Sequence, residues 1–196
     1  MTSELIFYTH PMSRTELLEF GPTMKAPQYL AINPMGKVPA IRHGGTVVTE
    51  CGAICAYLAD AFPEAGLAPP SGDPLRGPYY RWLFFGAGPV EAAVSNKALG
   101  LVVPQGREGM IGYGRLGDVL TTLERAVSEG DYLIGDRFTA ADVYLGAQIG
   151  WGMQLGSMEK RPAFERYWQR IAARPAAQRA KAIDDKLVAE RQKSAT

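Results

Sequence analysis

Two cysteines, Cys51 and Cys55, have side chains that can act as nucleophiles, redox centres or metal ligands. They stand four residues apart in the run Cys-Gly-Ala-Ile-Cys, so on a helix they would share one face. A disulfide framework needs more cysteines, and a zinc site needs further ligands, whereas His10 and His43 are distant in sequence. We therefore predict reduced thiols and no bound metal.

Polar residues also follow the first apolar run, in the segment Tyr-Thr-His-Pro-Met-Ser-Arg that covers residues 8–14. The Ser13 hydroxyl can donate a hydrogen bond to an anion, or it can cap a helix. Because no Cys-x-x-Cys pair follows this run, thioredoxin-like redox chemistry is disfavoured. Chemistry that uses Cys51 as a redox thiol stays open.

Composition restricts the class of partner. The chain has 196 residues, a formal net charge of +1 and acidic and basic residues mixed along its length. This pattern disfavours a nucleic-acid binder, which needs a basic face, and a polybasic membrane anchor. The first residues lack a basic leader, and the apolar stretches are too short to cross a bilayer. We expect a cytoplasmic protein without a nucleic-acid or membrane partner.

The first third of the chain combines strand signals with helical ones. Leu5–Tyr8 is a β-prone run, and Gly44-Gly45 is a turn signal between two further β-prone runs, which predicts a hairpin. The remaining predicted elements are a strand or helical turn over 15–20, one or two helical turns over 25–31, a loop from residue 33 into the hairpin, and a helix from 49 to 62.

After a turn-rich stretch the β signal disappears, so we predict domains at 1–68 and 79–196 with a linker at 69–78. Thr139 followed three residues later by Asp142 predicts a capping box at the start of a core helix. The tail after Lys186 is polar and is expected to fray. A long helical segment is predicted to begin with residues 79–87, and further helical segments are predicted at 110–128, 143–155 and 162–173.

Two motifs carry a resemblance to a known family. The first strand, the run Asn-Pro-Met-Gly-Lys-Val-Pro-Ala-Ile (33–41), the hairpin and the Thr-Glu-Cys helix resemble the thioredoxin-like domain of cytosolic glutathione transferases. The run Gly-Asp-Arg-Phe-Thr-Ala-Ala-Asp (135–142) resembles the capping signature of their helical domain. From Leu5 to about Ala182, the resemblance implies an α+β thioredoxin-like domain followed by an all-α helical bundle, in a bacterial type of member.

The resemblance also implies a glutathione site in the first domain. In the family, the proline matching Pro39 is cis, and the backbone matching Val38 pairs with the cysteine of glutathione like an added strand. Lys37 could reach a glutathione carboxylate, or it is a solvated surface lysine. Glu50 and Cys51 match an acid and a serine that hold the γ-glutamyl group at a helix N-terminus, where an anion is favoured.

Cys51 departs from the family serine, and a thiol is a weaker hydrogen-bond donor than a hydroxyl, so some loss of binding is expected. Ser13 matches the family position that activates the thiol, and it is our candidate catalytic residue. Tyr8 lies where some bacterial members carry a second contributor, although core packing is the role we favour for it.

A second departure lies after the first strand. A parallel β-α-β crossover needs a dozen or more residues, and only residues 10–14 separate the first strand from the run at 15–20. The first helix of the family domain is therefore missing from this sequence. Either a real deletion or an omitted segment accounts for this, and we favour omission because the flanking motifs are intact.

The family binds its second substrate against the first helices of the helical domain. Our candidates for that wall are aromatic or polar residues of the predicted helices, namely Trp82, Phe85, Asn96, Tyr113 and Trp151. The resemblance implies conjugation of glutathione to a hydrophobic electrophile, a detoxification role and a homodimer. A glutathione-dependent isomerase or dehalogenase and a non-catalytic binding or scaffold protein stay open as alternatives.

Overall fold

The computed structural model describes residues 4–8 and 23–194. The chain forms two compact units, one made of Met1–Ile54 and Ala172–Thr196, the other of Cys55–Ile171. The predicted strand or turn at residues 15–20, and the short crossover before it, lie outside the described residues. Across the parts of the chain that are described, no helix is long and apolar enough to cross a membrane.

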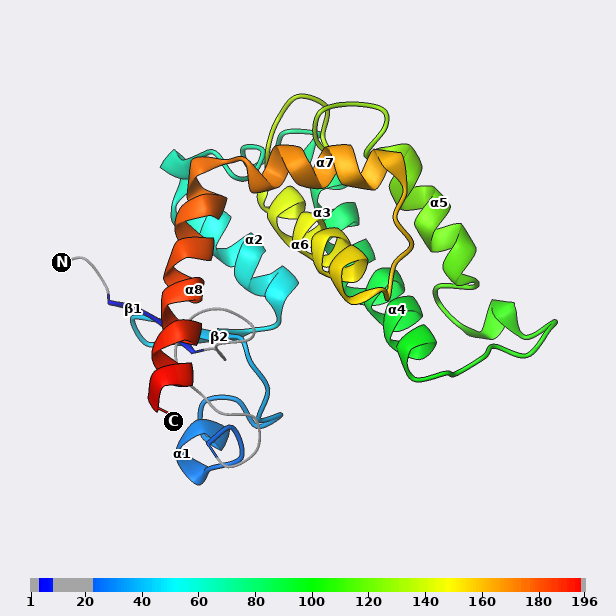
Figure 1. Ribbon diagram of the computed structural model, residues 1–196. Coiled ribbons are helices and arrows are strands. Elements are labelled where there is room, and N and C mark those ends of the chain that lie inside the picture. The colour runs from blue at the N-terminus through cyan, green and yellow to red at the C-terminus, as the bar shows by residue number, and fades with distance from the viewer. Residues whose placement is uncertain (1–3, 9–22, 195–196) are drawn as a thin grey trace. The chain divides into compact units, whose positions relative to one another are not determined.

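The first unit contains a three-stranded antiparallel sheet. Its strands are β1 (Leu5–Tyr8), β2 (Ala40–His43) and β3 (Thr46–Thr49), in the spatial order β1-β2-β3. Figure 1 labels β1 and β2. Within the ladder Tyr8 pairs with Ala40, and Ala40 pairs with Thr49. The predicted hairpin is confirmed, because β2 and β3 are joined at Gly44, whose positive φ of 58° suits a tight turn.

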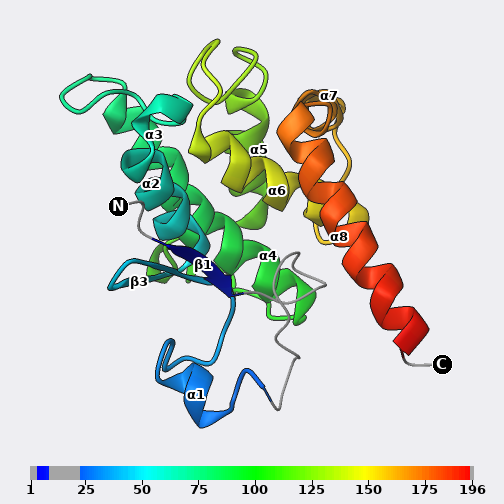
Figure 2. The ribbon, with the colours of Figure 1, turned by 90° about the vertical axis from the view of Figure 1, so that its left-hand side faces the viewer.

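A short helix, α1 (Pro27–Leu30), precedes β2 and confirms the predicted helical turns. Figure 2 shows α1 below the sheet, joined to it by the segment that leads into β2. The small core of this unit consists of Met24, Tyr29 and Ala40, with Tyr8 and Val38 among the residues packed against it. Tyr29 therefore anchors the segment after α1 to the first residue of β2.

The last helix, α8 (Pro175–Ser194), also belongs to the first unit. The expectation that the tail frays after Lys186 is wrong, since the helix continues to Ser194. Oppositely charged side chains four residues apart support it, as in the pair of Lys186 and Glu190, 3.8 Å apart.

Helix α2 (Cys51–Ala61) follows the hairpin as predicted. It is followed by one 3₁₀ turn, η1 (Pro63–Ala65), and the chain then turns at Gly66 with a φ of 65°. Pro63 and Gly66 lie where the helix ends, since proline and glycine commonly stop a helix.

The second unit begins its helical bundle with three consecutive helical segments. These are α3 (Arg76–Phe85), a π-helical turn η2 (Gly86–Val90) and α4 (Glu91–Ala98). The sequence predicted that a long helical segment begins at Tyr79, whereas the helix begins earlier, at Arg76. It passes Pro89, which lacks a backbone N–H, through the wider π turn.

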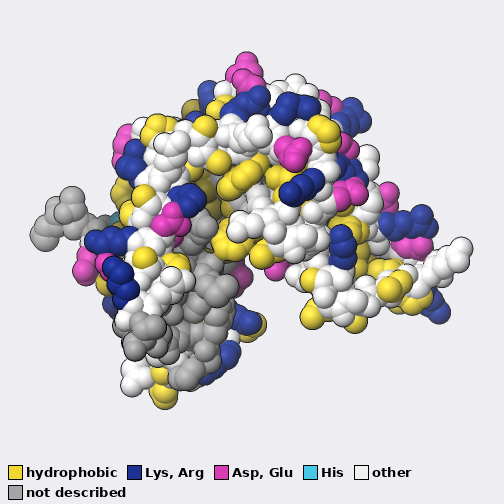
Figure 3. Space-filling model, in the orientation of Figure 1, with side chains coloured by type: hydrophobic (Ala, Val, Ile, Leu, Met, Phe, Trp, Pro, Cys, Tyr) yellow, Lys and Arg dark blue, Asp and Glu magenta, His cyan; other side chains and the backbone are white. Residues whose placement is uncertain are grey.

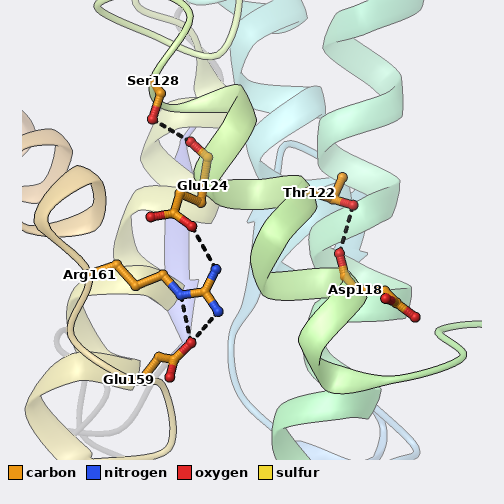
Figure 4. A network of polar contacts seen from close by, with 6 residues as sticks. All are labelled: Asp118, Thr122, Glu124, Ser128, Glu159 and Arg161. Carbon is orange, nitrogen blue, oxygen red and sulfur yellow. Dashed lines mark hydrogen bonds and ion pairs between the residues drawn. The ribbon is translucent and has the colours of Figure 1, made fainter.

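Helix α5 (Leu116–Ala126) begins later than the predicted residue 110, after a 3₁₀ turn, η3 (Glu108–Met110). Gly114, with a φ of 65°, interrupts the helical path just before it. Figure 4 shows Arg161 beside α5, where it donates to Glu124 of that helix at 2.8 Å. Arg161 also donates to Glu159 at 2.6 Å.

Helices α6 (Ala140–Leu155) and α7 (Pro162–Ala172) complete the second unit. Figure 1 shows α6 in the middle of the bundle, and its capping box at Thr139 and Asp142 is present as predicted. The Thr139 amide and hydroxyl donate to the Asp142 carboxylate at 2.8 and 2.9 Å. Tyr167 of α7 donates to the same carboxylate at 2.8 Å.

Glycines allow α6 and α7 to approach closely. A Cβ on Gly150 would lie 2.7 Å from the ring of Trp168, and a Cβ on Gly146 would lie 2.4 Å from Ile171. Real Cβ atoms do not approach other atoms this closely, so a larger residue at either position must displace α7 or its side chains.

Replacing Gly150 with alanine is expected to lower the free energy of unfolding by about 1–2 kcal/mol, since the overpacking cost exceeds the helix-propensity gain. Urea denaturation monitored by circular dichroism measures the change. Gly117→Ala on α5 is the matched control, because nothing lies within 4 Å of the added Cβ. That control should leave stability unchanged or raise it, and equal effects of the two substitutions would contradict the packing argument.

Candidate functional site

The segment Lys37–Pro39 leads directly into β2. The Val38–Pro39 peptide bond is cis, as the resemblance implied. Among the described residues, neither the amide nor the carbonyl of Val38 takes part in a backbone hydrogen bond, and its side chain is half-buried. An N–H and a C=O presented side by side at a strand end can pair with an extended peptide.

Two side chains hold the carbonyl of Lys37. The Tyr29 hydroxyl donates to it at 2.6 Å, and the Asn33 amide nitrogen donates to it at 2.8 Å. Burial raises the pKa of Tyr29, so this hydroxyl stays a donor. Because the Lys37 carbonyl belongs to the peptide unit that ends in the Val38 amide, the two donors fix the direction of that amide.

The loop before Lys37 is braced in turn. The Asn33 carboxamide oxygen accepts from the Met35 amide at 3.1 Å, and the Lys25 ammonium donates to the Met35 carbonyl at 2.8 Å. Gly36 has a φ of 56°, and a Cβ there would lie 2.7 Å from the Met24 carbonyl oxygen. The loop therefore does not accept a side chain at Gly36.

Sequence reasoning missed Tyr29 and Asn33. Asn33 carried a usable signal, since Asn before Pro often bonds the backbone two residues on, as its contact with Met35 does. Tyr29 carried none, because its bond to Lys37 crosses eight residues without a periodic pattern.

Tyr8 lies at the end of β1, half-buried against the small core. Its ring lies 6.1 Å from the ring of Tyr29, and the Arg42 guanidinium lies 6.0 Å from its centre. These contacts agree with the packing role favoured for Tyr8. A role in substrate binding stays a prediction.

Glu50 has the only positive φ found at a non-glycine residue in the described part of the chain, 69°. This left-handed conformation costs a side-chain-bearing residue about 1–3 kcal/mol, and such residues cluster at binding sites. Its carbonyl accepts the first helical bond, from the Ile54 amide at 2.9 Å. Glu50 and Cys51 are both exposed at the start of α2, where helix amides and the helix dipole favour an anion.

Ser13, the predicted thiol activator, lies outside the described residues. Its role in activating the thiol stays a prediction. The predicted omission of a segment after Arg14 stays a prediction as well. In the portion of the chain that the structure covers, no group of three or more potential metal ligands gathers.

The predicted wall residues of the second unit lie in three different places. Trp82 is buried in the helical core and meets Phe85 edge-on, with ring centres 5.6 Å apart. Trp151 lines a mostly apolar hollow of about 160 Å³ together with Val90, Val94, Leu155 and Met158. Asn96 donates to the Tyr113 hydroxyl at 2.8 Å, and Tyr113 lines a separate hollow beside α4. Their role as an electrophile wall stays a prediction.

Comparison with known proteins agrees with this architecture. Residues 10–61 match the family model "Glutathione S-transferase, N-terminal domain", and residues 100–175 match "Glutathione S-transferase, C-terminal domain". The chain is 32% identical to glutathione S-transferase GstA of Escherichia coli O157:H7, over 76% of this chain and 75% of that protein. It is 30% identical to maleylacetoacetate isomerase of Pseudomonas aeruginosa, over 82% and 78% of the two chains.

A solved structure gives the same result for the fold. The glutathione S-transferase of a sphingomonad, complexed with glutathione, is 30% identical, with a TM-score of 0.64 over 80% of this chain and 78% of that chain. The protein described here belongs to the glutathione transferase family. Its fold is accordingly a thioredoxin-like unit with a helical unit, as the sequence predicted.

Proposed function

We propose that this protein is a glutathione transferase that joins the glutathione thiolate to a hydrophobic electrophile. The observation that carries the proposal is the Val38 backbone just before β2, which makes no backbone hydrogen bond to another described residue. Its direction is fixed because the neighbouring Lys37 carbonyl accepts hydrogen bonds from Tyr29 and Asn33. A tripeptide can add to this backbone as a short strand. The glutathione bound in the sphingomonad relative supports the choice of ligand.

The ends of glutathione carry charges that three residues of the first unit complement. The γ-glutamyl carboxylate would accept from the Cys51 amide at the start of α2, and the Glu50 carboxylate would pair with the γ-glutamyl ammonium. The exposed Lys37 ammonium would pair with the carboxylate at the other end.

The reaction requires a thiolate at neutral pH, although an ordinary thiol has a pKa near 8.5. In this proposal the Ser13 hydroxyl donates to the glutathione sulfur and stabilises the anion. The thiolate then forms a carbon–sulfur bond to the electrophile, and the electron pair of the broken bond leaves with the leaving group. The apolar hollow at Trp151 supports an apolar electrophile.

Calorimetry and absorbance test the two halves of the proposal. Wild-type protein should bind glutathione saturably and show a thiolate absorbance near neutral pH. Glu50→Gln should raise the Kd for glutathione by about five- to tenfold, because it removes one charge-assisted bond. Ser13→Ala should leave the Kd nearly unchanged but abolish the absorbance.

Glu64→Gln is the matched control, since Glu64 is an exposed carboxylate on η1 and should not affect binding. Absence of binding by wild-type protein would contradict the glutathione site. Binding without a Ser13-dependent thiolate would contradict the catalytic half alone.

A second activity is favoured by the maleylacetoacetate isomerase relative. In an isomerase, glutathione adds to the substrate, a bond rotates, and glutathione leaves again unchanged. Product analysis separates the two activities, because conjugation consumes glutathione in proportion to product and isomerisation does not.

The same proposal includes a homodimer in the cytoplasm with a detoxification role. Two-fold symmetry is the commonest arrangement of homo-oligomers, and the exposed Phe84 on α3 gives an apolar contact for a second copy. Sedimentation should give twice the chain mass, and a monomer at micromolar concentration would refute the dimer.

A further inference from the structure

The hollow at Trp151, between α4 and α6, has a volume of about 160 Å³. A cavity of about that size holds one benzene ring. Most of its wall is apolar, and Figure 3 shows hydrophobic side chains exposed at the surface of the second unit. Among the described residues that line the hollow, Glu91 carries the only charge. The hollow therefore combines an apolar wall with a single negative charge.

The π-helical turn η2 determines which way Glu91 points. The Glu91 amide donates to the Gly86 carbonyl, five residues earlier in the chain. One extra residue in a turn rotates the helix that follows by about 100° relative to a continuous α-helix. Without this turn, α4 would carry Glu91 away from the hollow, and turns of this kind occur frequently at functional sites.

Gln148 of α6 joins the π turn to the Glu91 carboxylate. Its amide nitrogen donates to the Gly86 carbonyl at 3.1 Å and lies 3.5 Å from one Glu91 carboxylate oxygen. A Cβ on Gly86 would lie 3.0 Å from Gln148 Oε1, so glycine permits this close approach. The other Glu91 oxygen accepts no hydrogen bond from a described residue, so it is available to a ligand.

We infer that this hollow binds an arylalkyl ammonium group, with its ring against the apolar wall and its ammonium at the Glu91 carboxylate. One carboxylate in a lining without a cation favours a cation over a neutral group of the same shape. The Lys97 ammonium donates to the Ser157 carbonyl at 3.3 Å and does not line the hollow.

The inference also names a class of second substrate, and that step rests on the proposed function. The electrophile that the glutathione thiolate attacks would be an aromatic compound that carries an ammonium group. Glu91 would select it, and Gln148 would be the positioning residue that holds Glu91 at the hollow.

Benzylamine and benzyl alcohol test the binding step on the full-length protein without glutathione. They have the same shape, and only benzylamine is charged at neutral pH. In titrations followed by NMR, the wild type should bind benzylamine about fivefold more tightly at low salt, as expected for an ion pair with an exposed carboxylate. The preference should shrink as salt is added, and Glu91→Gln should abolish it.

Gln148→Met tests the positioning role. It should reduce the preference to about twofold and leave the affinity for benzyl alcohol unchanged, a ratio that a purely structural role would not alter. Glu165→Gln is the control, because Glu165 is an exposed carboxylate of the same unit that does not line this hollow. It should bind both probes like the wild type, and circular dichroism establishes that each variant is folded.

Conjugation of a chloronitrobenzylamine and of the matching chloronitrobenzyl alcohol tests the substrate class. The ratio of their kcat/KM values should fall about fivefold in Glu91→Gln, and intrinsic reactivity cancels in that comparison. An unchanged ratio would overturn the substrate class. Equal affinity for the two benzyl probes in the wild type, or no saturable binding of either, would overturn the binding site. Absence of conjugation with the binding preference intact would overturn the proposed function and leave the site standing.

Discussion

Replacing Asp142 with alanine is expected to lower the free energy of unfolding by about 3–5 kcal/mol, the largest effect of any single substitution considered for this chain. The Asp142 side chain is fully buried and accepts from Leu133 at 2.8 Å, from Thr139 twice and from Tyr167 at 2.8 Å. Alanine leaves all of these donors buried without an acceptor. Urea denaturation at a fixed protein concentration measures the loss.

Two milder substitutions keep the test informative if the alanine variant does not fold. Asp142→Asn retains one acceptor oxygen and should lose about 2 kcal/mol, and Tyr167→Phe should lose about 1 kcal/mol. Asp136→Ala, at an exposed carboxylate in the same connection, should change stability by less than about 0.5 kcal/mol. If Asp142→Asn and Asp136→Ala were equally stable, the buried network would not be what fixes the start of α6.

Replacing Asn33 with alanine is expected to weaken glutathione binding by about tenfold, although Asn33 is not among the residues proposed to touch glutathione. The change removes one of the two donors to the Lys37 carbonyl and the acceptor for the Met35 amide. The Val38 amide is then held through Tyr29 alone, in a loop that has lost its brace at Met35, and binding must restore its direction. Tyr29→Phe should weaken binding by about threefold, since Asn33 still holds the carbonyl.

Calorimetric titration of glutathione measures both effects, and Gln28→Ala on the exposed face of α1 serves as the control. Thermal unfolding of the same variants separates positioning from stability. A variant that is less stable but binds glutathione as tightly as the wild type would show that the clamp on Lys37 serves the fold alone.

The features that the sequence predicted are local ones. The capping box depends on two residues three apart, and the hairpin depends on adjacent glycines, so each can be recognised within a few positions. The cis bond before Pro39 followed from the family resemblance, because cis and trans proline cannot be told apart by composition.

The features that it missed depend on contacts between distant positions or on backbone geometry. The bond from Tyr29 to Lys37 forms because α1 folds back on the loop, and no spacing rule describes that path. The left-handed conformation of Glu50 is disfavoured for glutamate, so propensity argues against it.

The glycines of α6 also bear on what holds this helix in its folded form. Each glycine makes the free energy of helix formation about 1 kcal/mol less favourable than alanine would. The helix contains three of them, at Gly146, Gly150 and Gly152. A peptide excised from this region would therefore be largely unstructured, apart from a turn nucleated at its capped end. The central helix of the bundle therefore depends on tertiary packing for its stability, and side chains of α7 fill the space beside Gly146 and Gly150.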